Sequence, residues 1–269
     1  MLRIAVIGAG TIGEAIAKAL LKSGYKVTAT RRRTKLIRNL EKLGATITSD
    51  NRKAAEEADL IIVSVKPKDV KAVLKEIRSE VKGKVVISVA AAINLRYMKA
   101  VCPEAIMVRV MPNIAILVQE SLIAYCTDSE VTPKTEETIK EVLGVLGKPV
   151  KVEEFQMDAI TALNGCAPAY LSVIIEALTY AGLEVGLPRT LALLSAAQSM
   201  IGTGKLILEA GKNPLQIRDM VTTPGGITVR GLLELESVPI RYAIMKAVKK
   251  AMLRSKEISE TIREERNEG

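Results

Sequence analysis

The feature that most restricts the fold is a series of short, almost continuously apolar runs that alternate with helix-like segments in the first part of the chain. A strand made entirely of apolar residues is covered on both faces, and helices between successive strands provide that cover. Because crossovers between parallel strands are right-handed, the pattern predicts a doubly wound parallel α/β sheet. The expected strands are 2–7, 26–30, 60–65 and 85–90, and the expected helices are 12–22, 35–43 and 70–80.

The second part of the chain has a different periodicity. From residue 154 onward the strand signals stop, and helical patterns cover 158–186 (interrupted at Pro168), 189–210, 214–220 and 240 to the C-terminus. The sequence therefore predicts two domains, an α/β domain at residues 1–153 and an all-helical domain at residues 154–269. Apolar runs of this length in so small a helical domain indicate burial against another subunit, hence a homodimer or a higher homo-oligomer.

The composition excludes several classes of function. The 269 residues include no histidine, so no imidazole is present to activate a serine or cysteine nucleophile. Three cysteines without metal-like spacing predict neither a disulfide framework nor a metal site. The net charge of +9 arises from Lys and Arg interspersed with Glu and Asp at helical spacing, which is typical of a solvated surface and does not predict nucleic-acid binding.

No targeting or membrane segment is expected. Met1 leads directly into the first predicted strand, without the apolar core and cleavage site of a signal peptide. The longest uncharged stretches, 159–175 and 190–204, are broken by Asn, Pro, Gly and hydroxyl side chains, so neither is interpreted as a membrane span. The sequence predicts a cytoplasmic protein.

A glycine-rich turn stands between the first strand and the first helix. It reads Gly8-Ala9-Gly10-Thr11-Ile12-Gly13, which is the GxGxxG pattern in the strand–turn–helix context that a dinucleotide requires. The first glycine permits the tight turn, the second the approach of a pyrophosphate, and the third close packing of helix on strand. The helix N-terminus offers free N–H groups to the phosphates. The turn therefore predicts a Rossmann-type dinucleotide site.

The residues after the second strand indicate which dinucleotide is bound. NAD-binding proteins commonly place an acid there against the ribose 2′-hydroxyl, whereas this chain has Arg31, Arg32 and Arg33. Guanidinium groups form charge-assisted bonds with phosphate. We therefore expect NADPH, held mainly by Arg31 and Arg32, with NADH as a weaker alternative. Some of these arginines could instead be solvated charges that begin the next helix.

Four further motifs follow in order: SVKP at 64–67, RVMPN at 109–113, DAITALNGCAPAY at 158–170 and VTTPGGIT at 221–228. Together with the glycine-rich turn, they resemble the successive motifs of the pyrroline-5-carboxylate reductase family over nearly the whole chain. The resemblance implies an N-terminal NAD(P)-binding domain and a C-terminal helical domain that interlocks with a second copy. The sequence departs from the family pattern at three places: Ala92, where a glycine is usual, Cys166-Ala167, and Ile227.

The resemblance, with the physical features of the motifs, assigns candidate site residues. The expected cofactor-binding set is Gly8, Ala9, Gly10, Thr11, Ile12, Gly13, Arg31, Arg32, Asn51, Val65, Lys66, Pro67, Ala90 and Ala91. The expected substrate-binding set is Glu154, Thr223, Pro224, Gly225, Gly226, Ile227 and Thr228. If the N–H groups of Gly225 and Gly226 converge, they form a nest for a carboxylate; the alternative is a plain turn between helices.

The reaction that the resemblance implies is hydride transfer from NADPH to 1-pyrroline-5-carboxylate, which gives L-proline. A protonated imine needs no strong general acid, in keeping with the absence of histidine. Thr228 is expected to orient the ring nitrogen, with Lys66 as the alternative proton donor and an N-cap role as the alternative for Thr228. Two other functions stay open: a β-hydroxyacid dehydrogenase, with Lys205 as its catalytic lysine, and a non-catalytic NADP-sensing protein.

Overall fold

The computed structural model describes residues 1–267, and the side chains of residues 1–261. Within this range the chain forms two compact units. The sheet unit comprises Met1–Ala167 and the end of the chain from Lys250, and the helical unit comprises Pro168–Lys249.

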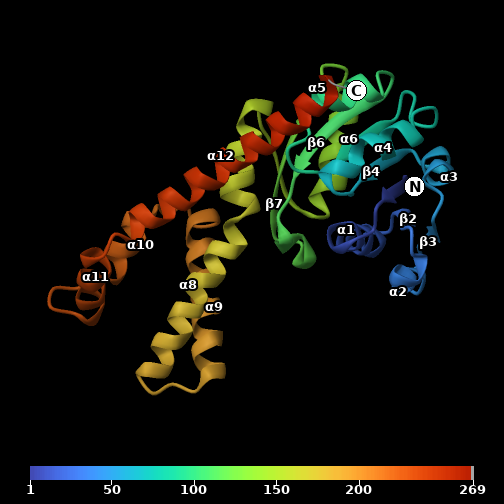
Figure 1. Cartoon of the computed structure of the whole chain (residues 1–269). Helices are drawn as coiled ribbons and strands as arrows, with labels where there is room; N and C mark the ends of the chain where they lie inside the picture. The colour runs from blue at the N-terminus through green and yellow to red at the C-terminus, as the bar shows by residue number, and fades with distance from the viewer. Residues whose placement is uncertain (268–269) are drawn as a thin grey trace. The chain divides into compact units, whose positions relative to one another are not determined.

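The sheet unit is built on eight strands in the order β3-β2-β1-β4-β5-β6-β7-β8 (Figure 1). The order reverses at β1, which pairs in parallel with both β2 and β4. All neighbouring strands are parallel except β6 and β7. The strands are β1 (Arg3–Ile7), β2 (Lys26–Thr30), β3 (Thr46–Thr48), β4 (Leu60–Val63), β5 (Val85–Ser88), β6 (Ile106–Met111), β7 (Ser121–Thr127) and β8 (Gly147–Lys151).

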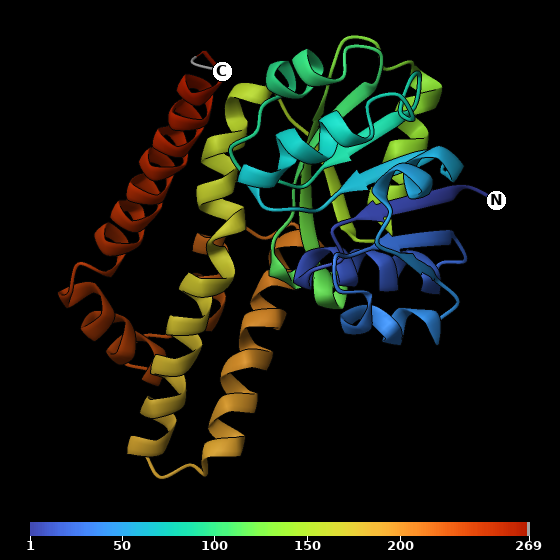
Figure 2. The same cartoon turned by 45° about the vertical axis from the view of Figure 1, so that its right-hand side comes forward.

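Helices cover both faces of this sheet (Figure 2). Successive residues of β1 alternate between two cores, with Ile4 and Val6 in one and Ala5 and Ile7 in the other. Residues from α1, α2 and α6 complete the first core, and residues from α3, α4 and α5 complete the second. These helices are α1 (Thr11–Lys22), α2 (Arg38–Glu41), α3 (Asn51–Glu57), α4 (Pro67–Glu76), α5 (Leu95–Val101) and α6 (Pro133–Gly144).

The predicted doubly wound sheet is confirmed, with differences in detail. The predicted strands match β1, β2, β4 and β5, with the ends of three of them trimmed. The predicted helix at 35–43 is instead a 3₁₀ turn, η1 (Thr34–Ile37), followed by the single turn α2. Two further 3₁₀ segments are η2 (Ile114–Val118) and η3 (Glu154–Gln156); α7 (Met157–Ile160) and a π-helical turn, η4 (Thr161–Gly165), follow.

The helical unit contains α8 (Ala167–Glu184), α9 (Arg189–Leu208), α10 (Pro214–Val221), α11 (Ile227–Ser237) and the first part of α12 (Ile240–Asn267). The predicted helical character is confirmed, and α11 is an additional helix. Asn213 caps α10 in a capping box with Gln216. The compact units divide the chain after Ala167 and before Lys250. They are defined by contacts and not by function, so a functional boundary between residues 153 and 154 stays a prediction.

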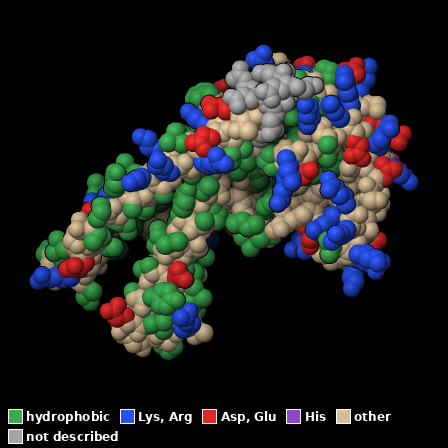
Figure 3. Space-filling model, in the orientation of Figure 1, with side chains coloured by type: hydrophobic (Ala, Val, Ile, Leu, Met, Phe, Trp, Pro, Cys, Tyr) green, Lys and Arg blue, Asp and Glu red, His purple; other side chains and the backbone are tan. Residues whose placement is uncertain are grey.

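Apolar side chains lie on the surface of α8 and α9, as the green atoms of Figure 3 illustrate. By length and composition, the helical stretch Glu154–Glu184 and the helix α9 are long and apolar enough to cross a membrane, with a mean hydropathy of 1.4 each. Two such helices are weak evidence of a membrane span, because the core helix of a soluble protein passes the same test. The polar residues that interrupt these helices do not by themselves exclude a span.

Candidate functional site

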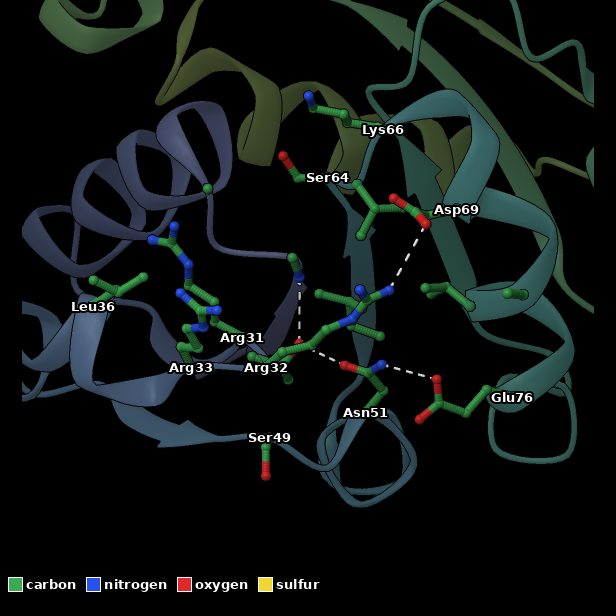
Figure 4. Close-up of a pocket in the computed structure, with 17 residues that line it drawn as sticks. Arg31, Arg32, Arg33, Leu36, Ser49, Asn51, Ser64, Lys66, Asp69 and Glu76 are labelled. Carbon is green, nitrogen blue, oxygen red and sulfur yellow. Dashed lines mark hydrogen bonds and ion pairs between the residues drawn. The ribbon is translucent and has the colours of Figure 1, made fainter.

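A cavity of about 510 Å³ lies at the carboxyl ends of β1, β2 and β4 in the sheet unit. The strand order reverses at β1, and the crevice at such a switch point is the usual ligand site of an open α/β sheet. The lining residues include Gly8, Gly10, Arg31, Arg32, Arg33, Asn51, Val65, Lys66, Asp69 and Glu76 (Figure 4).

The glycine-rich turn has the geometry that a dinucleotide requires. Gly8 has a φ of +90°, which favours glycine. A Cβ on Gly13 would lie 2.5 Å from the carbonyl oxygen of Gly8, so only glycine lets α1 pack this closely. A Cβ on Gly10 would meet nothing within 4 Å, and the missing side chain leaves open space beside the cavity. No side chain caps α1, so N–H groups of its first turn stay available to a phosphate.

The arginines after β2, Arg31, Arg32 and Arg33, all line the cavity, and their binding of a cofactor phosphate stays a prediction. Arg31 Nη1 donates a hydrogen bond of 3.2 Å to the carbonyl oxygen of Ala9 in the glycine-rich turn. Arg32 forms a loose ion pair of 3.8 Å with Asp69, and its side chain is 93% exposed. Three guanidinium groups next to an uncapped helix N-terminus create a strongly anion-attracting site.

Asn51 lies on the floor of the cavity in a fixed orientation. Its Oδ1 accepts a 2.6 Å hydrogen bond from the buried hydroxyl of Thr30, and its Nδ2 donates a 2.9 Å bond to Glu76 Oε2 (Figure 4). The Thr30 hydroxyl in turn accepts from the N–H of Gly8 at 3.3 Å. Glu76 was not predicted, because a glutamate in the last turn of a helix carries no local signal of a site.

Only some of the candidate cofactor residues line this cavity. Gly8, Gly10, Arg31, Arg32, Asn51, Val65 and Lys66 line it, whereas Ala9, Thr11, Ile12 and Gly13 belong to the turn and the start of α1, and Pro67 begins α4. Ala90 and Ala91 lie in the loop after β5. In that loop Ala92 has a φ of +63°, a left-handed conformation that suits the glycine usual at this position.

Glu154, a candidate substrate residue, is engaged within the sheet unit. Its Oε1 accepts a 2.6 Å hydrogen bond from the N–H of Leu95 and lies 3.6 Å from Nη1 of the buried Arg109. Arg109 Nη2 also lies 3.8 Å from Asp158 Oδ1, which accepts a 2.9 Å bond from the Ser255 hydroxyl. This cluster ties together β6, the segment after β8, the start of α5 and the end of the chain. Spacing along the sequence gave no signal of it.

The loop at residues 223–228 belongs to the helical unit and is a tight turn. The N–H of Gly226 donates a 3.0 Å bond to the carbonyl oxygen of Thr223, and Gly225 has a φ of +68°, as in a type II turn with Pro224 at its second position. Because the Gly226 N–H is used, the predicted nest of two glycine N–H groups is not formed here.

The first turn of α11 provides other donors beside this turn. Gly226 is the N-cap residue and supplies no side-chain cap, so N–H groups of the first turn are free to bind a carboxylate. Thr228 is the second residue of α11, so the alternative role of an N-cap threonine does not apply. Ile227 is 95% exposed.

Neither buried thiol is a nucleophile. Burial raises the pKa of Cys102 to about 11 and that of Cys126 to about 12. At neutral pH both are therefore protonated and unreactive. Among the described residues, no group of three or more His, Cys, Asp or Glu side chains is arranged to hold a metal ion.

Comparisons with known proteins cover almost the entire chain. The family described as "Pyrroline-5-carboxylate reductase dimerisation" matches residues 154–258, and "NADP oxidoreductase coenzyme F420-dependent" matches residues 3–92. Pyrroline-5-carboxylate reductase of Methanosarcina acetivorans is 36% identical over 263 residues, which is 95% of this chain and 97% of the relative. The Arabidopsis thaliana enzyme of the same name is 35% identical over 96% of each chain.

Solved structures agree with these relatives. A pyrroline-5-carboxylate reductase from Coxiella burnetii superposes with a TM-score of 0.89 at 30% identity, covering 96% of this chain and 98% of that one. The Plasmodium falciparum pyrroline carboxylate reductase, whose structure has NADP bound, gives a TM-score of 0.85 at 28% identity over 96% and 98% of the chains. With the ordered motifs and the dinucleotide turn already described, this similarity shows that the chain belongs to the pyrroline-5-carboxylate reductase family.

Proposed function

We propose that this protein reduces 1-pyrroline-5-carboxylate to L-proline with NADPH, the last step of proline biosynthesis. The observation that carries the proposal is the similarity at 36% identity to a curated enzyme of this name over 95% of the chain. The helical half supports it as well, because the dimerisation family matches residues 154–258. The protein is thus an NAD(P)H-dependent oxidoreductase.

The cavity of the sheet unit fits NADPH. Its glycine-rich turn leaves open space at Gly10 for a pyrophosphate, and the uncapped α1 faces the same space. Arg31, Arg32 and Arg33 provide cations where the ribose 2′-phosphate requires them, and no acid stands at the end of β2 to favour NADH. A relative with NADP bound supports the same choice. We assign the cofactor set to this cavity and its surrounding loops.

When bound, the reduced nicotinamide supplies a hydride for C5 of the imine, and the ring nitrogen carries the added proton. The chain's own groups bind and orient the substrate. Free N–H groups at the start of α11 hold the substrate carboxylate, and the Thr228 hydroxyl next to them hydrogen-bonds the ring nitrogen. The imine is taken up in its protonated form, so a strong general acid is not required. Lys66, which lines the cofactor cavity and is exposed, is the alternative proton donor.

The protein is a homo-oligomer that acts on a small molecule. We propose a homodimer or a larger assembly formed through the helical domain at residues 154–269, with the NADP-binding domain at residues 1–153. The apolar surface of α8 and α9 supports this arrangement, since a second copy would cover it. We further propose that the protein is cytoplasmic and binds neither membranes nor nucleic acids.

Two other functions have less support. A β-hydroxyacid dehydrogenase would use Lys205 as its catalytic lysine, but that side chain is 64% exposed and lies 3.9 Å from Glu209. Solved structures of such enzymes share only the fold, as for the Mycobacterium tuberculosis 3-hydroxyisobutyrate dehydrogenase at 15% identity and a TM-score of 0.56. A non-catalytic NADP sensor leaves the 223–228 turn and Thr228 without a role.

Turnover by the purified protein tests the proposal. We expect oxidation of NADPH that depends on 1-pyrroline-5-carboxylate and yields proline in equal amount. A short hydroxyacid with NADP⁺ should give no reduction of the cofactor. Cofactor binding without any turnover would favour the sensor, and turnover of the hydroxyacid alone would favour the dehydrogenase.

A further inference from the structure

The cofactor cavity is lined by charged groups of both signs, and Lys66 is among the cations. Arg31, Arg32 and Arg33 enter it from the loop after β2, whereas Asp69 and Glu76 line it from α4 (Figure 4). A carboxylate repels a phosphate, so the phosphate of a bound ligand belongs at the arginines. The space beside Glu76, which pairs with none of the described cations, is therefore left for a part of the ligand that donates hydrogen bonds.

The two acids that line the cavity differ in their partners. Asp69 is paired with Arg32 at 3.8 Å. Glu76 makes no ion pair among the residues that the structure describes, and its Oε2 accepts the 2.9 Å bond from Asn51 Nδ2. One carboxylate oxygen of Glu76, Oε1, thus remains available to a ligand.

Asn51 fixes the position of that carboxylate. Its amide cannot turn over without losing the 2.6 Å bond from the Thr30 hydroxyl to Oδ1, and Thr30 is only 1% exposed. The amide nitrogen is consequently held toward Glu76, and the chain of bonds runs back to the glycine-rich turn through the Gly8 N–H. An acceptor held in this way by a chain of hydrogen bonds is preorganised for a donor group of defined position.

The cavity also has apolar lining that suits a flat ring. Leu36, Val65, Ala72 and Val73 line it alongside the polar groups. A planar heterocycle with an exocyclic amine fits an apolar wall that carries one acceptor. The adenine base has this chemistry, because its N6 amine is a donor and its ring faces are apolar.

We propose that Glu76, oriented by Asn51 and Thr30, accepts a hydrogen bond from the exocyclic amine of the cofactor's adenine and so makes the site specific for that base. The proposal rests on the assignment of this cavity to NADPH. The arginines then fix the phosphate end of the adenosine and Glu76 fixes the base end. Specificity arises because a carboxylate would face the carbonyl oxygen of a hypoxanthine base, which cannot donate.

Titration calorimetry with two oxidised cofactors tests the proposal without turnover. The probes are NADP⁺ and its analogue in which hypoxanthine replaces adenine. The wild-type protein should bind the analogue roughly ten- to a hundredfold more weakly, because a hydrogen bond to a charged group is lost and an acceptor faces an acceptor. In Glu76→Gln the amide oxygen accepts the bond from Asn51 and the amide nitrogen faces the ligand, so the preference for adenine should be lost or reversed.

Asp69→Asn is the matched control, because it neutralises the other carboxylate of the same cavity. Loss of the ion pair between Asp69 and Arg32 changes both affinities alike, so the ratio of the two affinities should equal that of the wild type. Equal binding of both cofactors by the wild type, or a preference that Asp69→Asn abolishes and Glu76→Gln retains, would overturn the role of Glu76. Failure of the wild type to bind either cofactor would instead refute the assignment of the cavity to NADPH.

Discussion

The two compact units bury their apolar residues in opposite ways. The sheet unit has a core on each face of its sheet, with residues such as Ile16 and Leu74 completely buried. In the helical unit, by contrast, only Thr179, Ala192 and Ala196 of the described residues are buried, while large apolar side chains such as Leu194 and Leu208 are 64% and 72% exposed. The sheet unit buries its apolar residues within itself, whereas the helical unit leaves large apolar side chains exposed, and we propose that a second copy of the chain covers them.

The two units also differ in the candidate sites that they carry. The candidate cofactor cavity is lined by residues of the sheet unit, including Gly8, Arg31 and Glu76. The substrate candidates Thr223 to Gly225 and Ile227 are exposed on the helical unit. We therefore expect cofactor binding to depend on the sheet unit, and substrate turnover to depend on both units.

The largest effect is expected when charges are placed on the exposed apolar surface of α9. The double variant Leu194→Asp and Ile201→Asp puts two carboxylates at positions that are 64% and 53% exposed in a single chain. If a second copy covers these positions, each charge costs several kcal/mol on burial, so association should weaken by roughly a hundredfold or more. Light scattering at micromolar concentration should then change from an oligomer to a mass near 29.0 kDa.

The control for this variant lies in the sheet unit. Leu43→Asp changes a side chain of similar exposure, 47%, and should leave the oligomeric mass unchanged. A wild-type protein that is already monomeric at micromolar concentration would contradict the comparison between the units.

Cofactor preference should depend on Arg31 and Arg32. Each lost charge-assisted hydrogen bond to the 2′-phosphate should weaken NADPH binding by about 1.5–3 kcal/mol and leave NADH binding little changed. Fluorescence titration of Arg31→Ala and Arg32→Ala with both cofactors measures the difference. Equal losses for NADPH and NADH would refute the assignment of the 2′-phosphate to these arginines.

Thr228→Val tests the contribution of the helical unit to the chemistry. The substitution keeps the shape of the side chain and removes the hydroxyl at the start of α11. If the hydroxyl acts mainly in the transition state, kcat should fall by roughly ten- to a hundredfold, about 1.4–2.7 kcal/mol, with NADPH affinity unchanged. If it binds substrate and transition state alike, KM should rise instead.

Thr228→Ser restores a hydroxyl and should recover most of the lost turnover. Wild-type kcat and KM in Thr228→Val would show that solvent or Lys66 handles the ring nitrogen.

The stability of the sheet unit should depend on pH through Glu136. The ammonium of Lys151, 2.7 Å away, and the hydroxyl of the buried Tyr125, 3.0 Å away, hold the pKa of Glu136 at about 2. A lowered pKa means that the charged carboxylate stabilises the fold above its ordinary pKa of 4.5 and that this stability is lost as the pH falls from there toward 2. Glu136→Gln should cost about 1–2 kcal/mol at pH 7.

Denaturant unfolding at a fixed protein concentration measures this effect. The difference between Glu136→Gln and the wild type should shrink below pH 4.5 and vanish near pH 2. Glu137→Gln, which changes an exposed neighbour on the same helix, should have no comparable effect. A cost that is independent of pH would show that the carboxylate charge is not what stabilises the wild type.

Local signals made the sheet and the cofactor turn predictable from the sequence. Strands β1, β2, β4 and β5 are apolar runs, and the glycine-rich turn follows directly from its spacing. Strand β3 has three residues, and β8 contains Pro149 between two lysines, so neither carries a clear strand signal.

Contacts between distant residues could not be predicted in the same way. Glu76 acquires its proposed role from Asn51, on another helix, and Glu154 is engaged by Arg109 on β6. Such pairs form only once the sheet has brought their elements together. Pro224 and the two glycines predict a turn at 223–228. The hydrogen bond from the Gly226 N–H to the Thr223 carbonyl oxygen depends on the backbone angles of that turn, which the sequence alone does not specify.

The smallest effect is expected at Ala92, where the sequence departs from the glycine usual in the family. Ala92 is buried and has a φ of +63°, a conformation that costs a non-glycine residue about 1–2 kcal/mol. Ala92→Gly relieves that strain. It also removes a buried methyl group, which costs about 0.8 kcal/mol, and makes the unfolded chain more flexible, which costs a further amount of about 0.5–1 kcal/mol. The net change in stability should therefore lie within about 1 kcal/mol of zero. Ala90→Gly has the same two costs at a buried position without a positive φ, and should destabilise by about 1.5 kcal/mol. Thermal unfolding of both variants at equal concentration measures the strain as their difference. If the two variants lose the same stability, Ala92 stores no strain, and the family's glycine must serve the cofactor rather than the backbone.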